Sequence, residues 1–279
     1  MRKARCRARC WRCRGGRSRS GSARSLRERT PPYPTDVPDT VGLLALVGGD
    51  EFKPGNEEQD RLLVAAAKPG PAFVVPTAAA RQGPQEAVDH ATRWFSRLDL
   101  ELRELPVLKR ADANSKEIAE RARTGGFFYL VGGDPGLVAQ VLSGSRVWRA
   151  IFDAWRDGAS LAGSSAGAMA LCSHTLIRAS WPNRFNRRPA DALGVVPDTA
   201  VLPHYDTFGH RWIESARREL PGVTLLGIDE RSAATWTDAG WRAAGPGAVT
   251  VIKGSEKTIF KSGAKIAGLA IPARMLPSQ

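Results

Sequence analysis

Short apolar runs alternate with amphipathic stretches along the chain from Val41 onward. A short apolar run bounded by glycine or proline is typical of a buried strand, and apolar positions near a period of 3.6 are typical of a helix. The pattern predicts strands at Val41–Val47, Ala72–Pro76, Leu100–Val107, Phe127–Val131, Ser160–Ala162, Thr199–Leu202, Val223–Ile228 and Ala233–Thr237. It predicts helices at Arg61–Ala67, at Gln85–Leu98, after Asn114, in two stretches up to Arg156, and at His210–Leu220.

Regular alternation of strand and helix predicts an α/β fold with a mostly parallel sheet and helices on both faces. Glycine-rich breaks between Trp241 and Ala270 predict short antiparallel strands at the end of the chain. We therefore expect residues 41–279 to form a single α/β domain. Ligands of such folds bind beyond the carboxyl ends of the strands, and two Gly-Gly-Asp turns, at 48–50 and 132–134, fall there.

Residues 1–40 have a different composition from the rest of the chain. They contain twelve Lys and Arg residues against three acids, and so carry +9 of the net charge of +13. They lack apolar periodicity and are rich in Pro, Gly and Ser, which predicts a disordered basic tail. Two interpretations of this tail stay open: an extension from a wrongly assigned start codon, and a nucleic-acid-binding arm. Residues 41–279 carry the remaining net charge of +4, which does not favour a nucleic-acid partner for the domain.

No apolar run approaches the length of a transmembrane helix, and the tail lacks the apolar segment of a secretory signal. The sequence thus predicts a cytoplasmic protein with no membrane partner. Three of the four cysteines lie in the tail, spaced C-x3-C-x2-C without a fourth ligand, which argues against structural zinc. Cys172 lies in an apolar stretch that we interpret as helical core. We expect no metal and no organic cofactor.

A serine turn follows the short strand at Ser160–Ala162. The residues Gly163-Ser164-Ser165-Ala166-Gly167-Ala168 match G-x-S-x-G and precede the apolar, helix-like run Met169-Ala170-Leu171-Cys172. A strand, a tight glycine-flanked turn and a helix together form a nucleophile elbow, in which strain exposes the serine hydroxyl. The following N–H groups open a helix and can stabilise an oxyanion. Ser165 is therefore the predicted nucleophile.

A nucleophilic serine needs a base, and the chain offers four histidines. His204 follows the strand-like run at 201–203, so it should lie at the carboxyl end of a strand beside the elbow. His210 is the reserve candidate. His90 is predicted to be a surface residue of its helix, and His174 is poorly placed to turn back toward Ser165.

The third catalytic group must orient the imidazole. Glu230 and its neighbour Asp229 follow another strand, and only one of two adjacent side chains can point at the site. Asp191 and Asp198 remain alternatives, because an acid precedes the histidine in the α/β-hydrolase order. The order Ser165, His204, Glu230 is the simpler assignment.

Four motifs in order resemble one serine peptidase family. They are Val131-Gly132-Gly133-Asp134, the serine turn, Pro203-His204-Tyr205 and Gly227-Ile228-Asp229-Glu230. The chain resembles the family that contains cyanophycinase and aspartyl dipeptidase, which has a class I glutamine amidotransferase-like, flavodoxin-like three-layer fold. The resemblance implies Ser165 as nucleophile, His204 as base, and the N–H groups of Gly133 and Ala166 as the oxyanion hole. Glu230 matches the acid of the cyanophycinase pattern.

The resemblance implies an exopeptidase that cleaves a peptide or isopeptide bond through an acyl-enzyme, with a peptide or dipeptide as its substrate. Leu202-Pro203 replaces the Asp-Gln that precedes the histidine in cyanophycinase-like sequences, so specificity is not carried over. Asp134, Arg81 and Arg178 are candidate substrate-binding residues. The alternatives are an esterase or amidase acting on a small molecule, and a binding protein without catalysis. A homodimer is a further open expectation.

Overall fold

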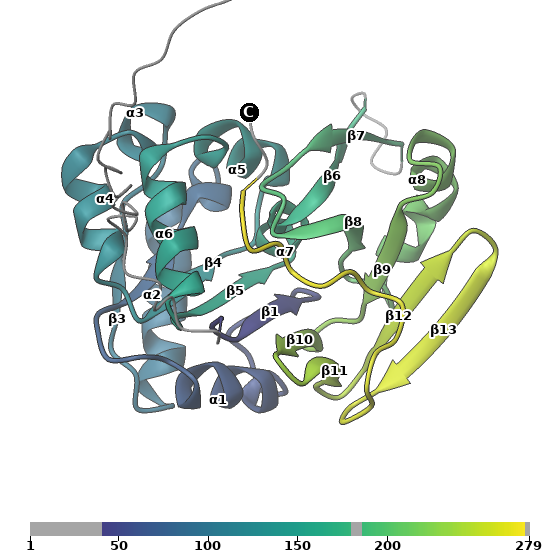
Figure 1. The fold of residues 1–279 in the computed structure, drawn as a ribbon, viewed down its shortest axis with the longest axis horizontal. Coiled ribbons are helices and arrows are strands. Elements are labelled where there is room, and N and C mark those ends of the chain that lie inside the picture. Colours follow the sequence, from purple (N-terminus) through teal and green to yellow (C-terminus); the bar gives the residue numbers. More distant parts are fainter. Residues whose placement is uncertain (1–40, 180–185, 277–279) are drawn as a thin grey trace, which may run out of the picture. The chain divides into compact units, whose positions relative to one another are not determined.

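The computed structural model describes residues 41–179 and 186–276. The predicted tail at 1–40 lies outside the described residues. The described chain contains two sheets, one of seven strands and one of six. Figure 1 shows both sheets, with the helices that precede α7 gathered around the seven-stranded one.

The seven-stranded sheet confirms the predicted α/β architecture. Its order is β11-β10-β1-β5-β4-β2-β3, and the five strands from β1 to β3 in that order are parallel. The strand bounds are β1 Leu44–Val47, β2 Ala72–Val75, β3 Leu102–Glu104, β4 Phe127–Leu130, β5 Ser160–Ser164, β10 Ala233–Thr237 and β11 Gly240–Ala244. The last two are antiparallel additions at one edge.

The second sheet was not expected as a separate sheet. Its order is β13-β12-β9-β8-β6-β7, with β6, β8 and β9 parallel and the others antiparallel. The strand bounds are β6 Cys172–Arg178, β7 Arg187–Asp191, β8 Val196–Leu202, β9 Thr224–Ile228, β12 Ala248–Lys253 and β13 Glu256–Lys261. The antiparallel strands predicted near the end of the chain are therefore confirmed, but they are shared between the two sheets.

The predicted helical environment of Cys172 is wrong. Helix α7 ends at Leu171, and Cys172 has the extended backbone of a strand, with φ −80° and ψ 176°. Every residue of α7 is buried and so is Cys172, so burial does not mark the point at which the helix ends and the strand begins. The prediction that Cys172 is a core residue rather than a reactive one agrees with its full burial, which raises the pKa of its thiol.

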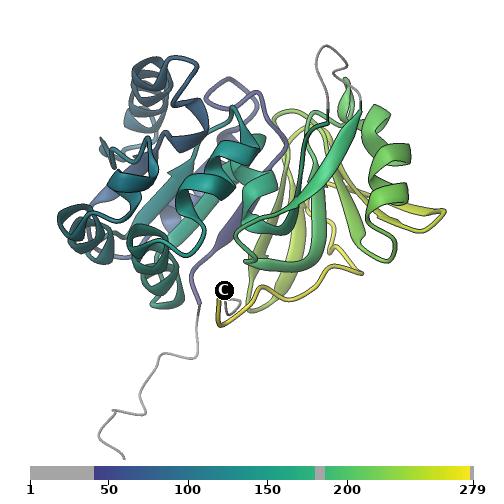
Figure 2. The same ribbon diagram turned by 90° about the horizontal axis from the view of Figure 1, so that it is seen from above.

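Side chains of the central strands alternate between two apolar clusters, one on each face of the sheet. Figure 2 shows helices on both sides of this sheet. In β1, Leu44 and Leu46 join one apolar cluster, whereas Ala45 and Val47 join the other. The helix bounds are α1 Glu57–Ala65, α2 Pro84–Ser96, α3 Arg110–Ala113, α4 Lys116–Arg123, α5 Pro135–Leu142, α6 Arg146–Arg156, α7 Ala166–Leu171 and α8 Ile213–Glu219. Helices α1 and α2 cover one face, and α4, α5 and α6 cover the other.

None of the helices in the described part of the chain combines the length and apolarity needed to cross a bilayer.

Asp60 is a carboxyl group buried in the layer formed by α1 and α2. Its side chain has no solvent exposure, and its Oδ2 accepts a hydrogen bond from Trp94 Nε1 at 2.8 Å. Its Oδ1 has no partner among the described residues. Burial disfavours the charged form and raises the pKa of Asp60 to about 8. Between about pH 4 and pH 8, the folded protein therefore keeps a proton on Asp60 that the unfolded chain has lost.

We expect the free energy of unfolding to fall as pH rises from about 4 to about 8, because only the unfolded chain releases the Asp60 proton in that range. The slope should approach about 1.4 kcal/mol per pH unit, the value for one proton. Asp60→Asn, which keeps an oxygen acceptor for Trp94, should remove this slope in denaturant titrations at several pH values. Asp89→Asn, at an exposed position of α2, is the matched control. An unchanged slope in Asp60→Asn would contradict the assignment.

Candidate active site

The serine turn has the strained geometry of an elbow. Ser165 lies between β5 and α7 with φ 47° and ψ −107°, a backbone conformation that side-chain-bearing residues rarely adopt. A Cβ on Gly163 would lie 2.5 Å from the carbonyl carbon of Gly167, and one on Gly167 would lie 2.3 Å from the oxygen of Leu130. Both flanking glycines are therefore required by close backbone approach.

His204 lies directly beside the serine. It follows β8 through Pro203, and its Nε2 is 3.1 Å from Ser165 Oγ. Its backbone N–H donates to the oxygen of Gly48 at 2.7 Å, and the ring of Phe208 stacks on the imidazole with centroids 4.8 Å apart. A Cβ on Gly49 would lie 2.4 Å from the imidazole ring. The ring is thus held between Phe208 and a backbone position that only glycine can fill.

Glu230 completes a chain of hydrogen bonds. His204 Nδ1 lies 2.8 Å from Glu230 Oε1, which also accepts from Thr207 Oγ1 at 3.3 Å. An ionised carboxylate can only accept, so Nδ1 carries the imidazole proton and Nε2 is free to accept from Ser165. The neighbouring Asp229 turns away, and its Oδ2 accepts from the N–H of Ala248. Burial raises the pKa of Asp229, consistent with its enclosed position.

The other acids and histidines that the sequence offered lie elsewhere. Asp191 ends β7 and Asp198 lies in β8, and neither has a described hydrogen bond to His204. His174 lies in β6 and contacts Ser173, and His210 contacts the oxygen of Tyr205. His90 is exposed on α2, as predicted, but it lines the cavity that contains Ser165, a placement that its helical surface pattern did not indicate.

The catalytic cavity has a volume of about 310 Å³. Gly133 lines it, with φ 140° and no room for a Cβ, which would lie 2.3 Å from the oxygen of Ala78. Ala166 is the first residue of α7, so its N–H has no acceptor within the helix. No described hydrogen bond uses the N–H of Gly133. These are the two groups that the sequence analysis expected to form the oxyanion hole.

Glu51 is a residue of the cavity that the sequence analysis missed. Its Oε1 accepts from the N–H of Gly132 at 2.8 Å, and its Oε2 accepts from Ser164 Oγ at 2.8 Å. The carboxylate therefore joins the turn after β4 to the residue that precedes Ser165. The available signal was its position immediately after the Gly-Gly-Asp turn at 48–50, at the carboxyl end of a parallel strand.

A second cavity of about 530 Å³ adjoins the first, and both are lined by Gln82 and Gly133. The predicted substrate-binding residues Arg81, Arg178 and Asp134 line it. Asp134 Oδ1 accepts from two N–H groups at the start of α5, at 2.9 and 3.2 Å, so this side chain caps the helix.

Arg187 also lines this second cavity and was not singled out in the sequence analysis. Its guanidinium lies 3.9 Å from the ring centroid of Trp212. Burial, followed by the charge of Arg178, lowers the pKa of Arg187 to about 10, so the group stays charged at neutral pH. The second cavity thus has a positively charged lining.

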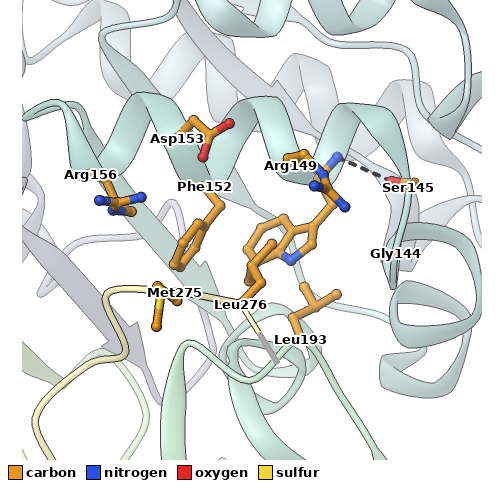
Figure 3. Close-up of a pocket in the computed structure, with 10 residues that line it drawn as sticks. Gly144, Ser145, Arg149, Phe152, Asp153, Arg156, Leu193, Met275 and Leu276 are labelled. Carbon is orange, nitrogen blue, oxygen red and sulfur yellow. Dashed lines mark hydrogen bonds between the residues drawn. The ribbon is translucent and has the colours of Figure 1, made fainter. Parts of the chain in front are cut away.

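A third cavity, of about 610 Å³, lies away from this chemistry. Its wall is formed by α6 on one side and by Met275 and Leu276 on the other (Figure 3). It contains none of the predicted site residues. Within the described ranges, no cluster of His, Cys, Asp and Glu has an arrangement that could bind a metal ion.

Comparison with known proteins identifies the family of the chain. The family model of peptidase family S51 matches residues 43–243. The crystal structure of a peptidase from an acI-B1 Actinobacterium is 32% identical, with a TM-score of 0.71, over 81% of this chain and 97% of that one. A structure from Listeria monocytogenes EGD-e, described as a peptidase E protein, is 19% identical over 78% and 98% of the two chains, with a TM-score of 0.52. No curated protein matches the chain.

The family match spans most of the described chain and includes the serine turn, His204 and Glu230. It confirms the family that the four motifs indicated. The likeness to the Listeria protein supports the fold only, because its identity is low. This chain belongs to peptidase family S51 and is a serine-type peptidase.

Proposed function

We propose that this peptidase hydrolyses a peptide or isopeptide bond of a short peptide through an acyl-enzyme on Ser165. The observation that carries the proposal is the chain of two hydrogen bonds, 3.1 Å from Ser165 Oγ to His204 Nε2 and 2.8 Å from His204 Nδ1 to Glu230 Oε1. A nucleophile bonded to a base, itself oriented by a third group, is the arrangement that activates a serine.

In the first half of the reaction, Ser165 Oγ attacks the carbonyl carbon while His204 Nε2 takes the hydroxyl proton. The electron pair of the carbonyl moves onto oxygen, which accepts hydrogen bonds from the N–H groups of Gly133 and Ala166. Glu230 keeps its bond to Nδ1 and stabilises the imidazolium. The intermediate then collapses, the C–N bond breaks, and His204 returns the proton to the leaving amine.

In the second half, water attacks the ester carbonyl of the acyl-enzyme. His204 takes one proton from the water, the same N–H groups hold the second oxyanion, and the C–O bond to Ser165 breaks. The proton moves from His204 to Ser165 Oγ, which restores the free enzyme. The residues named here complete the cycle with water as the only co-reactant.

The two adjoining cavities support a short substrate with a free carboxylate. Arg81, Arg178 and Arg187 line the second cavity, which shares a wall with the cavity that contains Ser165. A guanidinium group binds carboxylate strongly because it is planar and always charged. An exopeptidase or dipeptidase is therefore the finer function that we propose. A cytoplasmic location and a homodimer stay predictions.

The test is hydrolysis of a panel of α- and β-aspartyl dipeptides, each beside its C-terminal amide and beside p-nitrophenyl esters. We expect turnover of at least one dipeptide, and a lower kcat/KM for the amide that lacks the carboxylate. Mass spectrometry of acid-quenched reactions should detect the acyl group on the peptide that contains Ser165. Hydrolysis of the esters with no dipeptide cleaved would contradict the proposal and favour the esterase alternative.

A further inference from the structure

We propose that Glu51 binds the free α-ammonium group of the peptide substrate and thereby selects peptides cleaved at their first residue. The inference rests on the proposed function and adds the residue that recognises the amino end. Neither the serine turn nor the motifs used to recognise the family include Glu51.

The position of Glu51 brings its carboxylate beside the nucleophile. A Cβ built on Gly132 would lie 2.8 Å from Glu51 Oε1 and 3.4 Å from Ser165 Cβ, so one small space separates the two side chains. Glu51 and Ser165 line the same cavity of about 310 Å³. The α-ammonium of a substrate is two bonds from the carbonyl carbon that Ser165 attacks. A carboxylate at this distance from the serine matches the place where that ammonium must lie.

The orientation of Glu51 is set by neutral donors. The Gly132 N–H and the Ser164 hydroxyl each donate to one carboxylate oxygen, at 2.8 Å in both cases. Each oxygen of an ionised carboxylate keeps further acceptor capacity for another donor. Among the ion pairs of the described residues, none includes Glu51. The protein therefore holds this carboxylate in place without supplying the cation that would neutralise it.

A fixed negative charge close to Ser165 opposes the reaction unless a cation accompanies the substrate. The transition state develops a second negative charge on the carbonyl oxygen, and like charges at short range repel. An α-ammonium between Glu51 and the reacting carbonyl removes this penalty and adds a charge-assisted hydrogen bond. A peptide with a blocked amino end would meet the penalty without compensation.

The charges of the two cavities fit this orientation. The lining of the catalytic cavity includes no Lys or Arg among the described residues, whereas Arg81, Arg178 and Arg187 line the adjoining one. The shared wall at Gln82 and Gly133 brings the two regions into contact. A short zwitterionic peptide can therefore place its ammonium near Glu51 and a carboxylate near the arginines.

The experiment compares kcat/KM for a cleaved dipeptide and for its N-acetyl derivative, in the wild type and in Glu51→Gln. Glutamine keeps an oxygen acceptor and the size of the side chain but removes the charge. We expect the free-amine dipeptide to lose about 30-fold or more in kcat/KM, as for a charged hydrogen bond, with the N-acetyl peptide unchanged or faster. Asp50→Asn is the control, because Asp50 lies in the same turn but is paired with Lys53 and Arg231. It should keep the wild-type ratio of kcat/KM for the free-amine dipeptide to kcat/KM for the N-acetyl peptide.

An equal loss for both substrates would overturn the proposal, because Glu51 would then only position the turn after β4. Wild-type kcat/KM for both substrates in Glu51→Gln would also overturn it. If Glu51→Gln fails to fold, the wild type alone still tests the proposal. Its kcat/KM must be higher for the free-amine dipeptide than for the N-acetyl peptide, and a wild type without this preference would overturn the proposal. Calorimetry in Ser165→Ala separates this inference from the proposed function. In the double variant Ser165→Ala/Glu51→Gln, binding of the free-amine dipeptide should be weaker than in Ser165→Ala, and binding of the N-acetyl peptide should not change. This result does not depend on whether the wild type cleaves the dipeptide. Equal binding of the free-amine dipeptide by the two variants would overturn the proposal.

Discussion

Ser165→Ala should lower kcat for dipeptide hydrolysis by about 10⁴-fold to 10⁶-fold, the loss typical of removing a nucleophilic serine. Alanine removes the Oγ that lies 3.1 Å from His204 Nε2, so no acyl-enzyme can form. Binding should survive, because the oxyanion donors are backbone groups and the cavity is unchanged except for one oxygen atom. Steady-state kinetics and calorimetry on the same preparation separate the two effects.

Ser173→Ala is the matched control for this change. Ser173 Oγ lies in β6 and contacts His174 and the oxygen of Thr199, away from the catalytic cavity. It should retain wild-type kcat with at most a modest loss of stability. Full hydrolytic activity in Ser165→Ala would show that another group is the nucleophile and would contradict the mechanism.

Glu230→Gln should lower kcat by about 10²-fold to 10⁴-fold while leaving the fold intact, by analogy with the loss of the acid in other serine triads. Glutamine can still contact His204 Nδ1 but lacks the charge that stabilises the imidazolium. Its amide can also donate to Nδ1, which would leave the proton on Nε2 and prevent that atom from accepting the serine proton. The loss should appear mainly in kcat rather than in KM.

Asp229→Asn is the control, because the two acids are adjacent and only their direction differs. Asparagine can still accept from the N–H of Ala248, so activity should stay close to that of the wild type. Thermal unfolding of both variants checks that the comparison is between folded proteins. A larger loss of activity in Asp229→Asn than in Glu230→Gln would reverse the assignment of the acid.

The central sheet could be predicted because its parallel strands are buried on both faces. Such strands appear as continuous apolar runs, for example Phe127–Leu130 and Ala72–Val75. The arrangement of Ser165, His204 and Glu230 could be predicted for a related reason. Each follows the carboxyl end of a parallel strand, where ligands of such folds bind, although the sequence did not show that the strand before Ser165 belongs to a different sheet from the strands before His204 and Glu230.

The second sheet could not be predicted from local pattern. Strand β7 reads Arg187-Arg188-Pro189-Ala190-Asp191 and has no apolar alternation. Its extended form comes from pairing with β6, and α8 packs against it. Such a strand depends on partners distant in sequence rather than on its own propensity.

Two polar residues escaped sequence analysis because their roles depend on distant partners. Glu51 contacts Gly132 and Ser164, more than eighty and one hundred positions away. Asp60 in α1 is paired with Trp94 in α2, although a charged residue in a helix with three acids in its first turn is usually solvated. In both cases the residue type alone indicates an exposed side chain.

The serine and its two partners come from different sheets. Ser165 follows β5 of the seven-stranded sheet, whereas His204 and Glu230 follow β8 and β9 of the six-stranded sheet. Catalytic competence is therefore a property of how the two sheets are docked, and neither sheet is a smaller enzyme by itself. Substitutions in the shared apolar layer, far from any substrate, can change the turnover rate by shifting one half of the triad against the other.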